Sequence, residues 1–213
     1  MIEARGRRAA IVRAYNFFSY LYGNTAARLE REGVNRGLRQ VRVQPGARVL
    51  EVAVGTGVVF ERLRQRVGAR GHLVGVDLAP GMLAATRRRV GEAWLVRADA
   101  RALPFPTETF DIVWSSYLLD LIPTDELTPL VGEFRRVLKP GGRLLLVNFS
   151  KNSARLTRWE RAYRLTPTWL VAYLFGGCRP VEAEGFVRAA GFVAVAREFV
   201  AGGLDSEIIC GRK

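Results

Sequence analysis

Short apolar runs alternate with amphipathic segments through most of the chain. Five runs have the composition and length of buried strands; they cover residues 48–53, 72–77, 94–99, 110–115 and 143–148. Segments with helical character open near Val58, Gly81 and Glu126, between these runs. Strands that alternate with helices of this length predict an α/β domain, in which a parallel sheet is covered by helices on both faces. Ligands of such domains bind beyond the carboxyl ends of the strands.

The chain before the first strand predicts helices. Residues 8–32 follow a helical period, and their apolar-aromatic stripe consists of Ile11, Tyr15, Phe18 and Tyr22. Gly33 disfavours continuation, so we expect this helix to end there and a second short helix to cover residues 36–41. Residues 1–44 are therefore predicted to form a helical cap on the domain.

After the fifth strand, the alternation of strands and helices is interrupted, and it resumes near the end of the chain. Residues 151–185 are rich in aromatic and basic side chains and are predicted to form a lid over an acceptor. A helix that ends at Gly191 and strands near residues 193–199 and 206–210 then bring the expected sheet to seven strands. The prediction is one domain, with a core at 45–149 and a closing segment at 186–213.

Composition and charge narrow the class of protein. The chain has 213 residues and a net charge of +13, which indicates either solvated basic faces or attraction to an anionic partner. No zinc-finger or RNA-binding aromatic motif is visible, so an anionic membrane surface is favoured over nucleic acid. No apolar run approaches the ~20 residues of a membrane span, and no signal peptide is recognisable. With two distant cysteines, we expect a cytoplasmic protein, with peripheral contact at the inner face of the membrane as an option.

The first strand ends in a glycine turn, "LEVAVGTG" at residues 50–57. Gly55 and Gly57 lack side chains, so a ligand can approach the backbone closely, although an ordinary tight turn would look the same. Asp77 ends the second strand at the spacing of a carboxylate that accepts from ribose hydroxyls; it could also cap the following helix. Phe60 occupies the third glycine position of a dinucleotide motif, so a nucleoside without phosphates is favoured.

Further side chains could recognise a purine base. Asp99 ends the third strand, where a carboxylate can accept from an exocyclic amine. Leu78 and Met82 follow Asp77 and could pack on the face of the base, or they could belong to the core.

Together these stretches resemble the class I S-adenosylmethionine (SAM) methyltransferases. The resemblance covers about residues 45–149 and is carried by "VLEVAVGTG", "VGVDLAPGML", "RADARALPFPTETFDIVWSS" and "EFRRVLKPGGRLLLVN". It implies a Rossmann-like class I methyltransferase fold, SAM as cofactor and S-adenosylhomocysteine (SAH) as product. Ala53 stands where the family has the first glycine of its turn, and we expect only a slight change there.

The resemblance also implies a set of site residues. The cofactor is expected to contact Tyr15, Tyr22, Glu51, Ala53, Gly55, Thr56, Gly57, Asp77, Leu78, Met82, Asp99, Ala100 and Ser115. Glu51 would orient the methionine end of SAM, or bond to the N–H groups of the turn. One of the two tyrosines would reach the carboxylate of SAM, unless both pack on the core. No metal is expected.

Catalytic candidates follow the fourth strand. Asp120 could serve as a base, or could cap a helix or pair with an arginine. Tyr117 could line the methyl-transfer site, or could be a hydrophobic anchor. Methyl transfer depends mostly on placement of the acceptor, so a base is needed only where the nucleophile is protonated.

The flanks resemble two narrower groups. "YNFFSYLYG" and "GGCRPVEAEGFVRAAGF" are similar to the ubiquinone/menaquinone C-methyltransferases and to soluble bacterial phosphatidylethanolamine N-methyltransferases. This implies a lipid-soluble acceptor such as a demethylated quinone, with phospholipid or small-molecule methylation as alternatives. A non-catalytic SAM-binding or nucleic-acid-binding protein is the alternative of another class. The aromatic and basic residues of 155–177 could lie on an anionic membrane or form an ordinary cap. The oligomeric state is left open.

Overall fold

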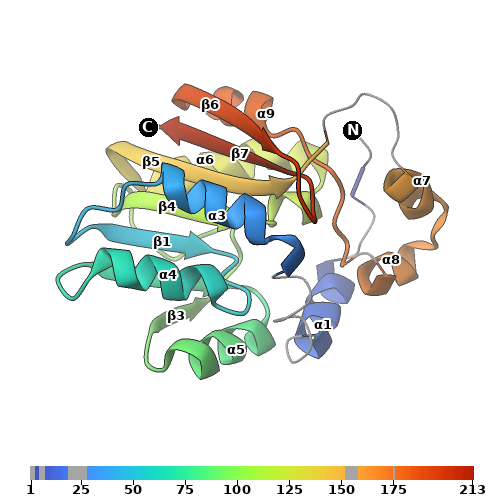
Figure 1. Ribbon diagram of the computed structural model, residues 1–213, viewed down its shortest axis with the longest axis horizontal. Coiled ribbons are helices and arrows are strands. Elements are labelled where there is room, and N and C mark those ends of the chain that lie inside the picture. The colour runs from blue at the N-terminus through green and yellow to red at the C-terminus, as the bar shows by residue number, and fades with distance from the viewer. Residues whose placement is uncertain (1–2, 5–7, 19–27, 152–157, 175) are drawn as a thin grey trace.

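A seven-stranded sheet forms the centre of the protein (Figure 1). The computed structural model describes residues 3–4, 8–18, 28–151, 158–174 and 176–213. The strands are β1 Arg48–Val52, β2 His72–Asp77, β3 Trp94–Arg97, β4 Phe110–Ser116, β5 Leu138–Phe149, β6 Val193–Val200 and β7 Ser206–Arg212. Strands β1 to β5 pair in parallel, and β7 runs antiparallel to both of its neighbours. The predicted mostly parallel α/β sheet is confirmed.

The order of the strands reverses at β1. The sequence of strands across the sheet is β3-β2-β1-β4-β5-β7-β6, so the chain winds outward from β1 in one direction and then from β4 in the other. The carboxyl ends of the parallel strands point toward helix α1 (Arg8–Phe18) (Figure 1). A ligand crevice is expected at this edge, between the ends of β1 and β4.

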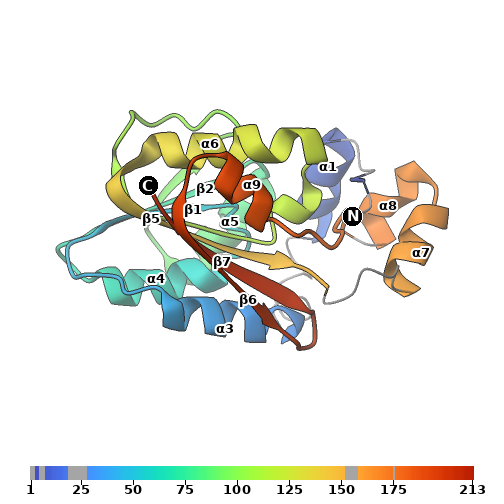
Figure 2. The ribbon, with the colours of Figure 1, turned by 90° about the horizontal axis from the view of Figure 1, so that it is seen from above.

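Helices cover both faces of the sheet (Figure 2). Helices α3 (Arg31–Gln40) and α4 (Val58–Val67) lie on one face, and α5 (Pro80–Val90) packs beside α4. Helices α6 (Leu127–Val137) and α9 (Glu184–Ala189) lie on the other face. Each face buries its own apolar cluster, one around Phe134 and the other around Trp114, and both side chains are fully buried.

The remaining helices gather beyond the carboxyl ends of the strands. The short helices η1 (Leu119–Leu121) and η2 (Thr124–Glu126) follow β4, and α7 (Arg158–Leu165) and α8 (Thr168–Leu174) follow β5. Helix α1 packs against α5 and α8. A buried ion pair of 2.8 Å between Lys151 Nζ and Glu160 Oε1 ties α7 to the end of β5. No described helix is long and apolar enough to cross a bilayer.

Gly33 does not end a helix, contrary to the prediction. It lies in the first turn of α3, which continues to Gln40. A Cβ at this position would come within 2.8 Å of both Ser206 Oγ and the Tyr117 hydroxyl. The glycine therefore allows α3 to approach β7 and the end of β4 closely. The part of the expected first helix that spans 19–27, with Tyr22, lies outside the described residues.

Candidate cofactor and acceptor site

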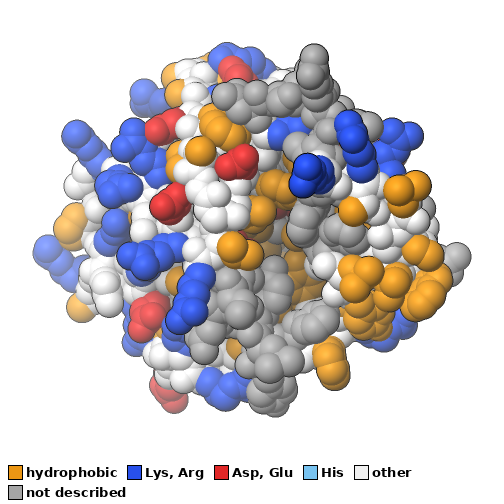
Figure 3. Space-filling view, turned by 45° about the vertical axis from the view of Figure 1, so that its right-hand side comes forward, with side chains coloured by type: hydrophobic (Ala, Val, Ile, Leu, Met, Phe, Trp, Pro, Cys, Tyr) orange, Lys and Arg blue, Asp and Glu red, His pale blue; other side chains and the backbone are white. Residues whose placement is uncertain are grey.

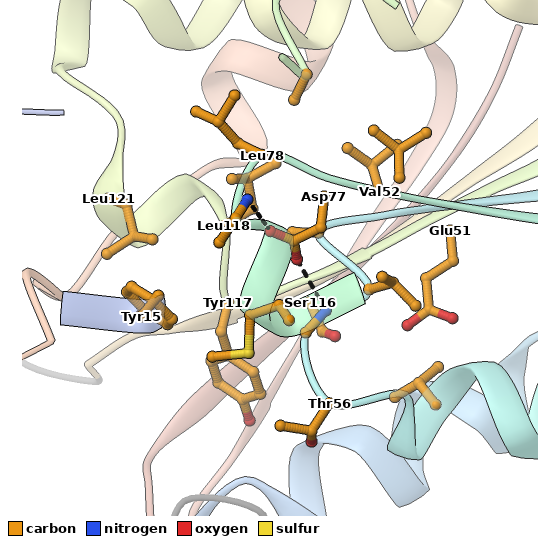
Figure 4. A pocket seen from close by; sticks show the side chains of 18 of the residues that line it. Tyr15, Glu51, Val52, Thr56, Asp77, Leu78, Ser116, Tyr117, Leu118 and Leu121 are labelled. Atoms are coloured by element: carbon orange, nitrogen blue, oxygen red, sulfur yellow. Dashed lines mark hydrogen bonds between the residues drawn. The ribbon is translucent and has the colours of Figure 1, made fainter. Parts of the chain in front are cut away.

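A cavity of about 700 Å³ opens where the sequence placed the ligand crevice. Its wall is formed by the turns after β1, β2, β3 and β4, by α1, and by the segment that leads into α3. Strand ends from both halves of the sheet therefore meet in one site. Figure 4 shows this wall, with Glu51 and Asp77 on neighbouring strand ends and Tyr15 opposite them.

The glycine turn is built from left-handed residues. Ala53 has a φ of 60°, Gly55 of 57° and Gly57 of 80°. A Cβ on Gly55 would meet nothing closer than the Ala53 carbonyl oxygen at 4.0 Å, so this position presents bare backbone to the cavity. Ala53 adopts the left-handed region at a small cost in strain, as a non-glycine residue does. Ala53, Gly55 and Thr56, which were expected to contact the cofactor, all line the cavity.

Gly57 has a different role from the one predicted. It is not part of the cavity wall, and a Cβ there would come within 2.9 Å of Thr86 Cγ2 on α5. Thr86 in turn donates a hydrogen bond of 2.8 Å to the Gly55 carbonyl. Gly57 therefore lets α5 pack on the turn, while Gly55 faces the ligand space.

Asp77 joins two turns and also lines the cavity. Its Oδ2 accepts a hydrogen bond of 2.9 Å from the Gly55 N–H, and its Oδ1 accepts one of 2.9 Å from the Ala79 N–H (Figure 4). Burial raises the pKa of Asp77, although these backbone donors lower it. Each carboxylate oxygen has two lone pairs, so both oxygens can still accept from ligand hydroxyls. The capping role and the ligand role proposed from sequence are thus compatible.

Glu51 is a buried carboxylate with an open hydrogen-bonding position. It is 1% exposed and lines the cavity, and its Oε2 has no hydrogen-bond partner among the described residues. Burial, and then the charge of Asp77, raises its pKa well above the usual range. A buried polar atom without a partner is costly, and a donor on a bound ligand would satisfy it. The described N–H groups of the glycine turn do not reach it, which favours the ligand role over the alternative.

One end of the cavity suits a flat base. Leu78, Met82 and Ala100 provide apolar wall, and Asp99 lies beside them. The Asp99 Oδ1 accepts a hydrogen bond of 3.1 Å from the Arg101 N–H. This carboxylate keeps further lone pairs for an exocyclic amine.

The side of the cavity across from Glu51 is more apolar (Figure 4). Tyr15, Leu118 and Leu121 form its wall (Figure 4). Tyr117 also lines it, with a strained φ of 52°, and its hydroxyl shares a hydrogen bond of 2.9 Å with Ser206 Oγ. Burial raises the pKa of Tyr117, so its phenol is neutral near pH 7. The tyrosine is therefore a fixed wall residue and a poor base.

Besides Gly57, two more of the predicted residues that the structure describes lie outside the cavity wall. Ser115 is buried inside β4, whereas Ser116, one position later, lines the cavity, because successive side chains of a strand point to opposite sides. Asp120 is fully buried, and both of its oxygens accept from the Phe149 N–H at 3.1 Å. It thus ties η1 to β5, and this position does not support Asp120 as the base.

The structure adds residues that sequence reasoning missed. Glu30, just before α3, lines the cavity together with Arg28, Arg31 and Arg62. Their positions depend on how α3 folds back onto the sheet, and no local pattern signals that. Every described group of His, Cys, Asp and Glu falls short of a metal-binding cluster.

The predicted lid does not reach the cavity in its described part. None of the described residues of 151–185 belongs to the wall. Helix α8 packs instead on α1, whose residues Ile11 and Val12 line the cavity. The Tyr15 hydroxyl lies 3.7 Å from Cys178 Sγ, which joins the same two layers. The described part of this segment is therefore a second layer behind α1.

Comparison with known proteins places this site in context. Residues 49–142 match the family model described as "Methyltransferase domain". The ubiquinone/menaquinone biosynthesis C-methyltransferase of Teredinibacter turnerae is 37% identical over 129 residues, which are 58% of this chain and 50% of the relative. The protein of the same name from Vibrio vulnificus is 41% identical over 114 residues, 51% of this chain and 43% of the relative. The chain thus spans about half the length of these curated relatives.

Solved structures share the fold. A SAM-dependent methyltransferase from Aquifex aeolicus superposes with a TM-score of 0.66 at 17% identity, over 92% of this chain and 97% of the other. Phosphoethanolamine N-methyltransferase 2 of Haemonchus contortus, solved with S-adenosyl-L-methionine, gives a TM-score of 0.70 at 18% identity, over 95% and 56%. At these identities the likeness concerns the fold alone.

Proposed function

We propose, from the premise that residues 49–142 belong to the methyltransferase domain family, that this chain transfers a methyl group from SAM to a lipid-soluble acceptor such as a demethylated quinone. The observation that carries the proposal is one cavity with two unlike ends. Its polar end contains Glu51 and Asp77, and its apolar end contains Tyr15, Leu118 and Leu121.

The polar end has the groups to hold the cofactor. Asp77 would accept from the ribose hydroxyls, Asp99 would accept from the amine of the base, and Leu78 and Met82 would contact its faces. The open oxygen of Glu51 would accept from the ammonium group of the methionine part. When bound, SAM supplies an electrophilic methyl group. The task of the chain is then to hold the acceptor close to it and in line.

The apolar end supports an acceptor with hydrocarbon character. Apolar and aromatic side chains of α1, of η1 and of the residue just before η1 form this wall. The curated relatives are named as quinone C-methyltransferases, and they support a quinone as the leading acceptor over the half of their length that this chain spans. Phosphatidylethanolamine and small amines remain the alternative acceptors on the resemblance of the flanks.

A patch of exposed apolar side chains supports delivery from a membrane. Trp169 is 70% exposed and Leu165 86% exposed, and Tyr173 and Leu174 are also exposed beside them. Figure 3 shows hydrophobic side chains gathered on this part of the surface, with basic side chains around them and a hollow nearby. The exposed Arg158 and Arg161 of α7 could add attraction to anionic lipid. We infer that α7 and α8 dock on the inner face of a membrane.

Methyl-labelled SAM tests the proposal directly. The protein is incubated with a naphthoquinol that has a short isoprenoid tail, with phosphatidylethanolamine vesicles, and with a small primary amine. We expect label on a ring carbon of the quinol. Label in the phospholipid or the amine alone would establish the corresponding alternative. SAM binding without transfer to any acceptor would favour a non-catalytic role.

A further inference from the structure

Glu30 brings a carboxylate to the acceptor side of the cavity. It is the residue immediately before α3 and forms part of the cavity wall. Tyr117 fixes its backbone, because the tyrosine hydroxyl donates a hydrogen bond of 3.3 Å to the Glu30 carbonyl. Within the described parts of the chain, the carboxylate itself has no hydrogen-bond or ion-pair partner. Its backbone is thus held, while its oxygens remain open to a ligand.

The groups around Glu30 place its side chain near the apolar end. Its backbone carbonyl contacts the hydroxyl of Tyr117, which directly follows β4. Its charge also raises the pKa of Tyr117, of Asp120 in η1 and of Cys178 behind α1, as expected of a group near all three. Cys178 is the residue that contacts the Tyr15 hydroxyl. The carboxylate therefore lies beside the wall that contains Tyr15 and Tyr117.

The basic groups near Glu30 do not neutralise it by contact. Arg28 and Arg31 flank it in sequence and line the same cavity, and neither makes a described ion pair with it. Arg62, which reaches the cavity from α4, donates a hydrogen bond of 2.6 Å to Asn35 Oδ1. Burial raises the pKa of Glu30 to about 7. At neutral pH, both forms of this carboxyl are then populated, as suits a group that takes up and releases a proton.

The other candidate bases of the cavity are committed elsewhere. Asp77 accepts from the N–H groups of two turns, and Glu51 lies next to it on the polar end. Asp120 faces the Phe149 N–H, outside the cavity. Tyr117 is neutral and bonded to Ser206. Glu126 also lines the cavity, but its Oε2 forms an ion pair of 2.6 Å with Arg101 Nε. Among these described carboxylates, Glu30 combines a position without an ion pair with the acceptor side.

We propose that the Glu30 carboxylate is the general base that removes the phenolic proton of an aromatic acceptor. The O–H bond of the phenol breaks, its electron pair stays on the phenol oxygen, and the proton forms a new O–H bond with a Glu30 oxygen. The resulting phenolate is a far better carbon nucleophile than the phenol, because its charge spreads onto the ring. This proposal rests on the proposed function, because it presupposes an acceptor of the quinol class.

Glu30→Gln tests the proposal, with Glu32→Gln as its matched control. Glu32 lies two residues further on, in the first turn of α3; its side chain is exposed, and it is not part of the cavity wall. With the short-tailed naphthoquinol as probe, Glu30→Gln should lower kcat by about 100-fold and leave KM within a few-fold. The rise of the wild-type rate with pH near neutrality should disappear in this variant. Glu32→Gln should keep the wild-type rate and pH profile.

Carbon NMR of the protein labelled at its glutamate carboxyl carbons provides a readout that does not depend on activity. The resonance missing from Glu30→Gln should titrate near pH 7 and should shift when the naphthoquinol is added to the SAH-saturated protein. The Glu32 resonance should do neither. A Glu30 carboxyl that titrates in the usual acidic range and ignores the probe would overturn the proposal, and so would an unchanged rate in Glu30→Gln. Failure of the proposed function would appear separately, as absence of methyl transfer from SAM to the naphthoquinol by the wild-type protein.

Discussion

The ring of Phe60 lies against the backbone of Gly75, so closely that a Cβ on Gly75 would come within 3.0 Å of Phe60 Cε2. In a dinucleotide site, the third glycine of the turn motif gives the helix room to approach the strand. Here α4 carries a buried phenyl ring at that position. The room for this ring comes from β2, where Gly75 has no side chain. The close packing of α4 on the sheet therefore does not need the third glycine that a dinucleotide site has.

This packing predicts selectivity for SAM and SAH over NADH. The turn has no third glycine for a pyrophosphate, whereas Asp77, Asp99 and Glu51 suit a nucleoside with an amino-acid tail. Calorimetry should show binding of SAH and no comparable heat with NADH. Tight binding of NADH and none of SAH would reverse the assignment of the cavity.

Asp77→Ala should weaken both the fold and the site. The Gly55 and Ala79 N–H groups lose their acceptor, so the free energy of unfolding without ligand should fall by about 1–3 kcal/mol. The affinity for SAH should fall by a similar free energy, because the ribose hydroxyls lose their acceptor as well. Chemical denaturation and calorimetry measure the two effects. Asp125→Ala, at an exposed position in η2, serves as control and should change neither.

Glu51→Gln should remove part of the dependence of stability on pH. Burial raises the folded-state pKa of Glu51 above its ordinary value of 4.5, so the folded protein holds this proton more tightly than the unfolded chain. Its contribution to stability is complete below pH 4.5 and is lost as pH rises through the folded-state pKa. Glutamine does not ionise, so denaturation at pH 5 and pH 8 should show a smaller loss in the variant.

The same substitution separates stability from binding. At pH 8, Glu51→Gln should bind SAH roughly 10-fold more weakly, because the neutral amide oxygen accepts a weaker hydrogen bond from the ammonium group than a carboxylate does. If the wild-type protein and Glu51→Gln lost the same free energy of unfolding between pH 5 and pH 8, the raised pKa of Glu51 would be contradicted. Unchanged affinity for SAH would contradict its role at the cofactor.

Trp169→Ala should weaken attachment to anionic vesicles. Sedimentation with the wild-type protein should show binding that falls with added salt, because salt screens the arginines of α7. The part that persists at high salt should weaken by roughly 2 kcal/mol in the variant, because that part comes from apolar burial. Trp94→Ala is the matched control: Trp94 is 62% exposed, but it lies on the edge strand β3, where it stacks on His72. Vesicle binding that is absent at low salt, or equal losses in both variants, would refute docking through α8.

The sequence was sufficient for the order of strands and helices and for the polar end of the cavity. Apolar runs and helical patterns are local, so the strands β1 to β7, the turn residue Gly55 and the strand-end residue Asp77 could be predicted without knowledge of their neighbours in space. The resemblance to the class I SAM methyltransferases is confirmed by the match over residues 49–142 and by the fold. His72 lies at the amino end of β2 and is not part of the cavity wall.

The site and helix predictions that differ from the structure depend on long-range contacts or on a shift of one position along a strand. Ser115 and Ser116 are neighbouring serines. Only the side-chain alternation along β4 decides which of them faces the cavity. Gly33 reads as a helix stop, but its neighbours Ser206 and Tyr117 are far away in sequence and require a small residue. Glu30 reaches the cavity through the same long-range packing.

Helix α1 has one side in the cavity wall and contacts α8 on another. A bilayer that moved α8 would therefore also shift α1, which lies between α8 and the cavity. Thermodynamic linkage then makes membrane and cofactor effectors of each other: a tenfold gain in vesicle affinity on SAH binding requires a tenfold gain in SAH affinity on vesicles. Titrating SAH with and without anionic vesicles measures this coupling, and equal affinities would mean that α1 transmits nothing. A positive coupling would load the enzyme with cofactor preferentially at the surface where the proposed lipid-soluble acceptor would dissolve, and would leave it largely idle elsewhere.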